Sequence, residues 1–302
     1  MLRALLLAVA AVVLIPDSAW AWGPATHVYL GTEVLRSLVL LPPAIRALLG
    51  AFPKDFLYGS VAADISLAKK YVPEGRHCHN WHIGEEILAT AETDRLRAVG
   101  YGYLSHLAAD TVAHNLFVPR QLLLTSSSKA LGHSYWEHRM DVQLGERFTR
   151  VARDVVMDHD HSAADALFDR VLSATLFSFQ TNRRIFRGMI RFQDNDRWQS
   201  IFGTIRQNSR WSLSESAIHD YTALSFDYII DYLNRRGSAI PAGMDPIGDQ
   251  NLSISKRVRR MAINEGKLNS PRLMEEMADN FFPLPEKPFN YLARPRVERE
   301  AS

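Results

Sequence analysis

Residues 94–117 limit the possible folds more than any other part of the chain. They form a predicted helix that carries apolar residues on nearly every side. A helix of this kind is buried rather than laid on a surface. It carries His106, Asp110 and His114 at intervals of four residues. Each interval turns the side chain by only about 40° around the helix, so the three residues form one stripe. Buried ionisable groups are costly unless a charged partner satisfies them, which favours a bound metal ion.

Helical spacing of apolar residues recurs along the rest of the chain, while the alternation typical of strands is weak. Proline and glycine mark the expected helix ends, with Pro119 ending the central helix. We therefore predict a compact all-α fold of many helices. The predicted helices are 26–41, 43–49, 84–91, 94–117, 134–159, 163–179, 182–193, 196–209, 215–235, 253–265 and 271–280. Between them we expect mixed loop and helix at 55–71 and connecting loops at 121–132 and 237–248.

The first 21 residues have the pattern of a secretory signal peptide. A basic start at Arg3 precedes an apolar run over residues 4–15, and the segment ends in Ala19-Trp20-Ala21. The apolar run is too short to span a bilayer comfortably. We expect residues 1–21 to be removed, which predicts a secreted or periplasmic protein. One helical domain over residues 22–282 would follow, and a proline-rich, charged and extended tail over residues 283–302.

Removal of this segment would make Trp22 the new N-terminus. A free terminal amine and the carbonyl oxygen of the same residue can chelate a metal ion together, which an internal residue cannot do. His27 follows five residues later and could add an imidazole ligand. Trp22 is thus either a metal ligand created by proteolysis or simply the residue after a signal peptide.

The net charge limits which partners the chain can bind, and the cysteine content limits what can stabilise its fold. The formal net charge of +2 is too small to indicate binding to nucleic acid. Cys78 is the only cysteine, so no intrachain disulfide can form. In an exported protein the hydrophobic core, together with any bound metal, must then hold the fold.

Further histidines and carboxylates could contribute to the same metal site. His133 and Glu137 lie one helical turn apart, shortly after the first stripe, so two antiparallel helices could bring both sets together. Three histidines surround Cys78, and Asp64 stands alone in an apolar stretch, where it is either a ligand or a helix N-cap. The three histidines are His77, His79 and His82.

This order of residues resembles the zinc-dependent phospholipase C family, which also takes in fungal single-strand nucleases with the same trinuclear zinc site. The resemblance spans residue 22 to about residue 141. Its spacing suits His79 best, with His77 close behind, and its interval between Asp110 and His114 is shorter than in several relatives. The residues that carry it are Trp22, His27, Asp64, His79, His106, Asp110, His114, His133 and Glu137.

The resemblance implies three zinc ions per chain with divided ligands. One ion would be bound by Asp64, His79, His106 and Asp110, and a second by His114, His133 and Glu137. The third would be bound by the Trp22 amine and carbonyl with His27 and Asp110, so that Asp110 bridges two ions.

The resemblance also implies a hydrolase that attacks a phosphodiester with metal-activated water. Asp64 would orient or deprotonate that water. We expect a phospholipase C that acts on glycerophospholipids during transient contact with a membrane surface. Two alternatives remain: a single-strand nuclease or 3′-nucleotidase with the same zinc site, and a non-catalytic, zinc-stabilised envelope protein. Nucleic acid is an expected partner only in the first of these.

Overall fold

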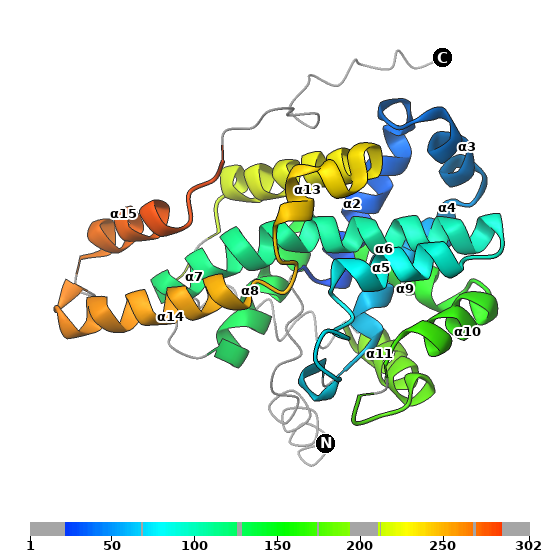
Figure 1. Ribbon diagram of the computed structural model, residues 1–302. Coiled ribbons are helices and arrows are strands. Elements are labelled where there is room, and N and C mark those ends of the chain that lie inside the picture. The colour runs from blue at the N-terminus through cyan, green and yellow to red at the C-terminus, as the bar shows by residue number, and fades with distance from the viewer. Residues whose placement is uncertain are drawn as a thin grey trace.

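The computed structural model describes residues 22–285 except 68, 126–128, 174, 194–210, 212 and 268–269. Within these ranges the chain forms helices and no strand, so the predicted all-α fold is confirmed (Figure 1). The predicted signal peptide, the helix at 196–209 and most of the tail after residue 282 lie outside the described residues.

Helix α6 (Asp94–Val112) is the central element of the fold (Figure 1). Thr93 is its N-cap: the hydroxyl oxygen accepts a hydrogen bond from the Leu96 backbone N–H at 3.3 Å. Its side chains are buried along most of its length, as its apolar composition predicts. It is surrounded by α2 (Pro24–Arg36), α4 (Pro53–Ala62), α5 (Trp81–Thr90) and α13 (Glu215–Arg235).

Two glycines allow α4 and α6 to cross at very short distance. A Cβ atom at Gly102 would lie 2.0 Å from the Phe56 carbonyl oxygen, and one at Gly59 would lie 2.0 Å from the Val99 carbonyl oxygen. No side chain fits at either position, so the two backbones are in direct contact. This crossing sets Asp64, which follows α4, against the middle of α6.

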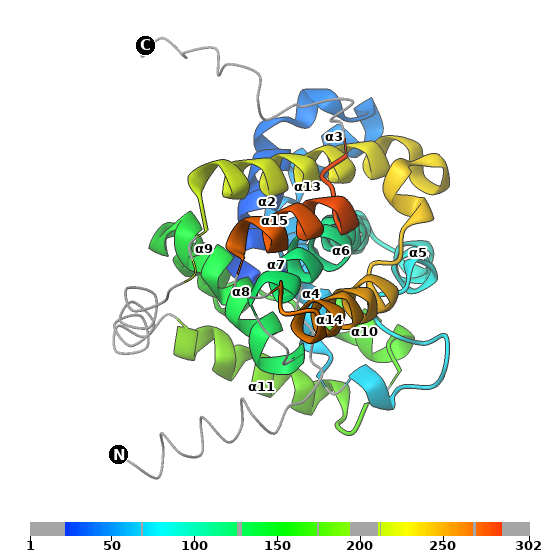
Figure 2. The same cartoon turned by 90° about the vertical axis from the view of Figure 1, so that its left-hand side faces the viewer.

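The remaining helices cover these five. They are α3 (Pro43–Ala51), α8 (Lys129–Leu144), α9 (Glu146–Met157), α10 (Ser162–Val171), α11 (Phe179–Gln193), α14 (Asp249–Asn264) and α15 (Pro271–Phe281). Short 3₁₀ turns are η1 (Leu38–Leu40), η2 (Ala63–Ile65), η3 (Lys69–Tyr71), η5 (Arg236–Ser238) and η6 (Ile240–Gly243). Helices α14 and α15 lie on one side of the molecule and share a small separate core with α7 (Val118–Thr125) (Figure 2).

Pro119 does not end the central helix, and the loop predicted at 121–132 is wrong for its described residues, 121–125 and 129–132, which are helical. After α6 the chain makes a π-helical turn, η4 (Ala113–Phe117), and continues as α7, while α8 begins at Lys129. Pro119 has no N–H to donate to the carbonyl of Asn115, four residues earlier. The Asn251 side-chain amide donates to that carbonyl oxygen instead, at 3.3 Å. The wider π turn and this outside donor let the chain remain helical.

The predicted helix at 134–159 is two helices. Helix α8 ends at Leu144 and α9 begins at Glu146, with Gly145 at φ +93° between them. That backbone conformation strongly favours glycine, so the break has a local cause that apolar periodicity does not reveal. The first helix is also shorter than predicted, because α2 ends at Arg36 and η1 follows.

Candidate metal centre

The structure brings all nine predicted ligand residues into one buried region. They come from the start of α2, from η2 after α4, from the segment before α5, and from α6, η4 and α8. Each of the nine is at most 4 % exposed. Ionisable side chains are rarely buried at this density without partners of opposite charge.

One ligand atom each from Asp64, His79, His106 and Asp110 lies in a close group around the two imidazoles. The His79 Nε2 atom lies 3.1 Å from His106 Nε2, 3.1 Å from Asp110 Oδ2 and 3.5 Å from Asp64 Oδ1. The His106 Nε2 atom lies 3.0 Å from Asp110 Oδ2 and 4.0 Å from Asp64 Oδ1. A tetrahedral zinc ion with bonds of about 2.0–2.2 Å keeps its ligand atoms roughly 3.3 Å apart. The spacing of this group fits such an ion.

The two carboxylate oxygens of Asp110 face different groups. Oδ2 faces His79 and His106, while Oδ1 lies 3.3 Å from His27 Nε2. The His27 and His106 rings stack with centroids 3.8 Å apart, which places the two groups side by side. A carboxylate in this position can bind one ion through each oxygen, as the predicted bridging role requires.

His114, His133 and Glu137 form a separate group, with ligand atoms within 4.8 Å of one another. The His133 Nε2 atom lies 2.9 Å from Glu137 Oε1, as expected for residues one turn apart on α8. His114 lies on the π turn η4 rather than on regular helix. Single π turns occur often at functional sites, because they change the direction of a side chain.

Backbone carbonyls fix the orientation of two of the histidines. His106 Nδ1 donates to the Ser60 carbonyl oxygen at 2.9 Å, and His114 Nδ1 donates to the Pro246 carbonyl oxygen at 2.5 Å. A carbonyl oxygen can only accept, so Nδ1 carries the proton in both rings. The lone pair on Nε2 is then available to a metal ion, an arrangement common in metal-binding histidines.

Several buried polar atoms at the centre make no hydrogen bond with any described residue. They are His27 Nε2, Asp64 Oδ2, both carboxylate oxygens of Asp110, His114 Nε2 and Glu137 Oε1. Buried polar atoms are nearly always satisfied, and these belong to residues that face one another. Nitrogen and oxygen lone pairs gathered without thiolate match the ligand set of a hydrolytic zinc site. The donor chemistry therefore fits the predicted metal, and the binding itself stays a prediction.

Burial also adjusts the protonation of these groups. It lowers the pKa of His27, and it lowers the pKa of His114 to about 3, so both imidazoles are neutral near pH 7. Burial and the charges of Asp64 and Asp110 raise the pKa of Glu137 well above its usual range. Neutral imidazoles are ready to bind a metal ion, while Glu137 must release a proton first.

Asp141 holds the first turn of α2 in place, close to Trp22 and His27. Its carboxylate accepts hydrogen bonds from the Thr26 N–H at 2.9 Å, the Thr26 hydroxyl at 2.6 Å and the Ala25 N–H at 3.2 Å. A Cβ atom at Gly23 would lie 2.1 Å from an Asp141 oxygen, so only glycine fits there. The carboxylate at the helix N-terminus satisfies N–H groups that have no partner within the helix.

The Trp22 side chain anchors the predicted mature N-terminus in the core. Its indole Nε1 donates to the Ala109 carbonyl oxygen at 3.1 Å and to Ser225 Oγ at 3.2 Å. Ala109 directly precedes Asp110, so Trp22 lies beside the bridging carboxylate. The role of its amine as a ligand stays a prediction.

Of the three histidines around Cys78, His79 lies within the centre. His77 lies just outside, where its Nδ1 accepts a hydrogen bond from the His79 N–H at 3.1 Å. His82 is exposed. His77, Cys78 and His79 form a further group that could hold a metal, although it shares His79 with the group that contains Asp64 and His106.

Sequence reasoning missed Lys69, which lies in the centre with its side chain 2 % exposed. Its Nζ atom donates to Asp64 Oδ1 at 2.9 Å. The only sequence signal is a lysine five residues after Asp64 in a largely apolar stretch, and this spacing does not predict a contact. The sequence also did not show that residues 245–248 would pack against His114.

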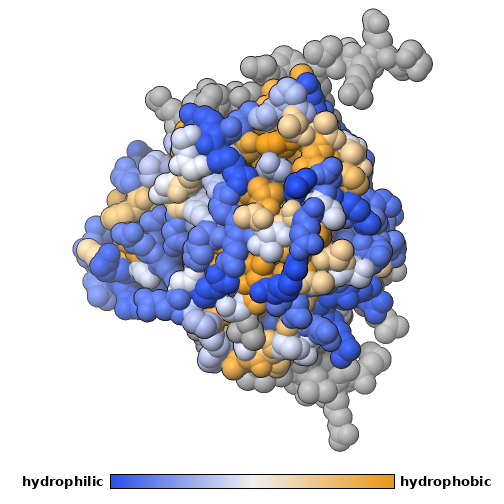
Figure 3. All heavy atoms as spheres, turned by 45° about the vertical axis from the view of Figure 1, so that its right-hand side comes forward, coloured by the Kyte–Doolittle hydropathy of each residue, from blue (hydrophilic) through white to orange (hydrophobic). Residues whose placement is uncertain are grey.

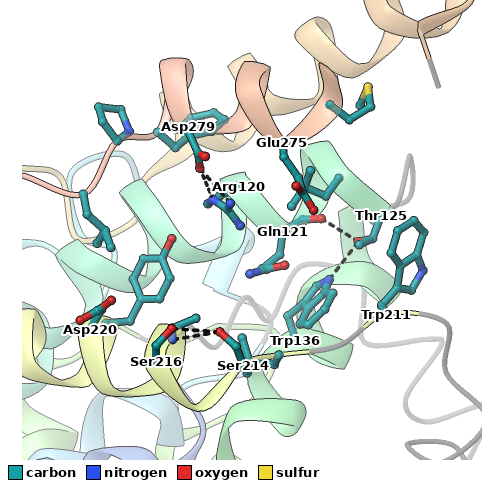
Figure 4. A pocket seen from close by; sticks show the side chains of 18 of the residues that line it. Arg120, Gln121, Thr125, Trp136, Trp211, Ser214, Ser216, Asp220, Glu275 and Asp279 are labelled. Atoms are coloured by element: carbon teal, nitrogen blue, oxygen red, sulfur yellow. Dashed lines mark hydrogen bonds and ion pairs between the residues drawn. The ribbon is translucent and has the colours of Figure 1, made fainter. Parts of the chain in front are cut away.

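A cavity of about 1120 Å³ lies apart from the metal centre, between α7, α8, α13, α14 and α15 (Figure 4). Aromatic side chains, including Trp136 and Trp211, form part of its wall, and the ion pair between Arg120 and Asp279 forms another part. None of the nine predicted ligands is among the described residues that line it. The chemistry predicted from the sequence therefore belongs to the buried centre and not to this cavity.

Comparison with known proteins agrees with the geometry of the centre. The family model for zinc-dependent phospholipase C matches residues 26–181, just over half of the chain. The match includes eight of the nine predicted ligands, begins after Trp22, and extends beyond residue 141, where the expected resemblance ended. No curated protein sequence and no solved structure matches the chain significantly. The chain belongs to the zinc-dependent phospholipase C family, a family of phosphodiester hydrolases.

Proposed function

We propose that this chain is a phospholipase C that hydrolyses glycerophospholipids with three zinc ions, after export and removal of residues 1–21. The observation that carries the proposal is Asp110, whose two oxygens face separate ligand groups at 3.0–3.3 Å. A carboxylate shared in this way supports metal ions held close together. Such ions stabilise the attacking and leaving oxygens of a displacement at phosphorus and activate water at neutral pH.

The residues of the chain have distinct tasks in this proposal. The histidines and carboxylates bind and orient the metal ions, and the Ser60 and Pro246 carbonyls fix the imidazoles that do so. Asp64 would accept a hydrogen bond from the attacking water, because its Oδ2 makes no hydrogen bond with any described residue. Burial alone would raise the pKa of Asp64, but the nearby Lys69 ammonium lowers it overall, so the carboxylate is ionised near pH 7.

Exposed apolar side chains support a lipid substrate. Tyr71 is 53 % exposed on the segment between Asp64 and His79, and Leu176 and Phe177 are 60 % and 41 % exposed between α10 and α11. Arg76 connects the two segments: its guanidinium donates to Ser173 Oγ at 3.5 Å and to the carbonyl oxygen of Val171, at the end of α10, at 2.6 Å. The face in Figure 3 likewise carries apolar patches among hydrophilic residues. No described helix is long and apolar enough to cross a membrane.

Matched assays on lipid and nucleic acid test the proposed substrate. Protein that begins at Trp22 and is loaded with zinc is incubated with phosphatidylcholine vesicles, with single-stranded DNA and with a 3′-nucleotide. We expect release of diacylglycerol and a phosphorylated head group, abolished in Glu137→Ala. Cleavage of DNA or of the nucleotide alone would favour the nuclease alternative. Full zinc content without turnover of any substrate would favour a non-catalytic, zinc-stabilised protein.

A further inference from the structure

Lys69 places a full positive charge inside the predicted metal centre. Its side chain is 2 % exposed, and its Nζ atom lies 2.9 Å from Asp64 Oδ1. The same Nζ atom lies 3.4 Å from His79 Nε2 and 3.5 Å from His79 Nδ1. A buried lysine is costly without a partner, and the carboxylate of Asp64 is the partner here.

The ammonium group of Lys69 lies beside the group formed by Asp64, His79, His106 and Asp110 rather than at its centre. A metal ion binds imidazole along the lone pair of one nitrogen. Lys69 Nζ is almost equally distant from both nitrogens of His79, so it lies on neither lone pair. The ammonium therefore does not block the Nε2 lone pair of His79, which faces the ligand atoms of Asp64, His106 and Asp110. It still lies within hydrogen-bonding distance of Asp64.

Charge makes Lys69 and a metal ion competitors for Asp64. Both cations gain energy from the same carboxylate oxygen, and they repel each other across a short distance in a region of low dielectric. Without a metal ion, Lys69 compensates the negative charge of Asp64. With a metal ion at Asp64 and His79, the ammonium must share that oxygen or move away. In either case the free energy of metal binding becomes less favourable.

We propose that Lys69 is a built-in counter-cation of the Asp64–His79 ligand group, which stabilises that group before a metal ion binds and weakens the binding of zinc there. The inference rests on the zinc binding proposed above. It assigns Lys69 a thermodynamic role at the metal site, not a chemical step. Removal of its charge should destabilise the zinc-stripped protein and tighten its binding of zinc.

Neutral replacements at position 69 test this role. Lys69→Met keeps the length of the side chain, and Lys69→Gln keeps a hydrogen-bond donor without charge. Lys54→Met is the matched control, because Lys54 is exposed on the first turn of α4. Each protein begins at Trp22, is stripped with a chelator, and is titrated with zinc in competition with a chromophoric chelator. Thermal unfolding is recorded with and without zinc.

For both variants at position 69 we expect zinc to bind at least tenfold more tightly at one site. We also expect a lower Tm of the stripped protein and a larger rise of Tm on addition of zinc. The control should match the wild type. If a stripped variant is unfolded, circular dichroism should show that zinc refolds it.

Zinc affinity that is unchanged or weaker in both variants would overturn the inference, as would failure of zinc to refold a variant that is unfolded when stripped. Weaker binding would assign Lys69 to positioning Asp64 as a ligand. If the wild type binds zinc and the variants bind it no more tightly, the proposed function stands and only the role of Lys69 fails. A wild type that binds no zinc would overturn both.

Discussion

Individual side chains of the centre are held by contacts that local sequence does not reveal. The spacing of His106, Asp110 and His114 predicts their common stripe, but it does not reveal that Ser60 and Pro246 orient two of the rings. Lys69 is a stronger case, because only the folding of the segment between Asp64 and His79 brings its charge to these ligands. Residue types and spacing thus predict the candidate ligands, while their surroundings depend on tertiary contacts.

Zinc binding by His114, His133 and Glu137 should weaken as the pH falls. The pKa of Glu137 is well above its usual range because of burial and the nearby carboxylates, so zinc must displace a proton from it. Zinc titrations from the usual glutamate pKa of 4.5 upward should show affinity rising with pH, accompanied by proton release. In Glu137→Gln, which cannot ionise, this group should lose its zinc. Affinity that is constant over this range would contradict the raised pKa.

Asp141 should make the stability of the protein depend on pH. Burial raises its pKa to about 6 from its usual value of 3.8, so folding favours the protonated form. The contribution of Asp141 to stability is therefore present at low pH and falls as the pH rises from about 4 to about 6, by up to about 3 kcal/mol. Denaturant unfolding of Asp141→Asn and wild type should show the variant gaining relative stability across this interval. A constant difference between them would mean that Asp141 titrates normally.

At the scale of elements, apolar periodicity predicts which helices exist better than where they end. The burial of α6 follows from its composition, and the predicted segment at 215–235 matches α13. The pattern predicts a helix end at Pro119 that the structure does not have, and it does not predict the break at Gly145. A π turn and the Asn251 amide accommodate Pro119 within a longer helical path, and the positive φ of Gly145 breaks a pattern that looks continuous.

The close crossing of α4 and α6 should tolerate no side chain at Gly102. Gly102→Ala would place a Cβ atom 2.0 Å from the Phe56 carbonyl oxygen and 2.8 Å from the Ser60 backbone nitrogen. Both are backbone atoms, so the helices must separate, and we expect a loss of about 3 kcal/mol or more in unfolding free energy. Gly188→Ala on α11 is the control, since among the described residues no atom outside its own stretch of helix lies within 4 Å of its Cβ position. Denaturant unfolding should show it to be neutral or stabilising by up to about 1 kcal/mol. Equal stability of the two variants would contradict the close crossing.

At the scale of the whole molecule, segments distant in sequence meet at one buried centre. Trp22 contacts Ala109 and Ser225, Thr26 contacts Asp141, and His114 contacts Pro246. The start of the domain, its central helix and the residues near 245 are therefore connected through the region that carries the predicted ligands. Metal ions bound there would link several helices in a chain that has no intrachain disulfide.

The position of the N-terminus should determine how many metal ions bind. If the Trp22 amine is a ligand, one extra residue before Trp22 should remove one zinc ion per chain and most of the activity. The comparison uses two proteins that differ only in this residue, with zinc measured by elemental analysis. Equal zinc content in both would show that the amine of Trp22 is not a ligand.

The central claim is that the buried histidines and carboxylates bind zinc, and zinc content tests it most directly. Protein that begins at Trp22 is dialysed against zinc and then against metal-free buffer, and zinc per chain is measured beside His133→Ala and Glu137→Ala. We predict three zinc ions in the wild type and fewer in each variant. A folded wild-type protein that retains no zinc, or the same zinc content in all three proteins, would contradict the account.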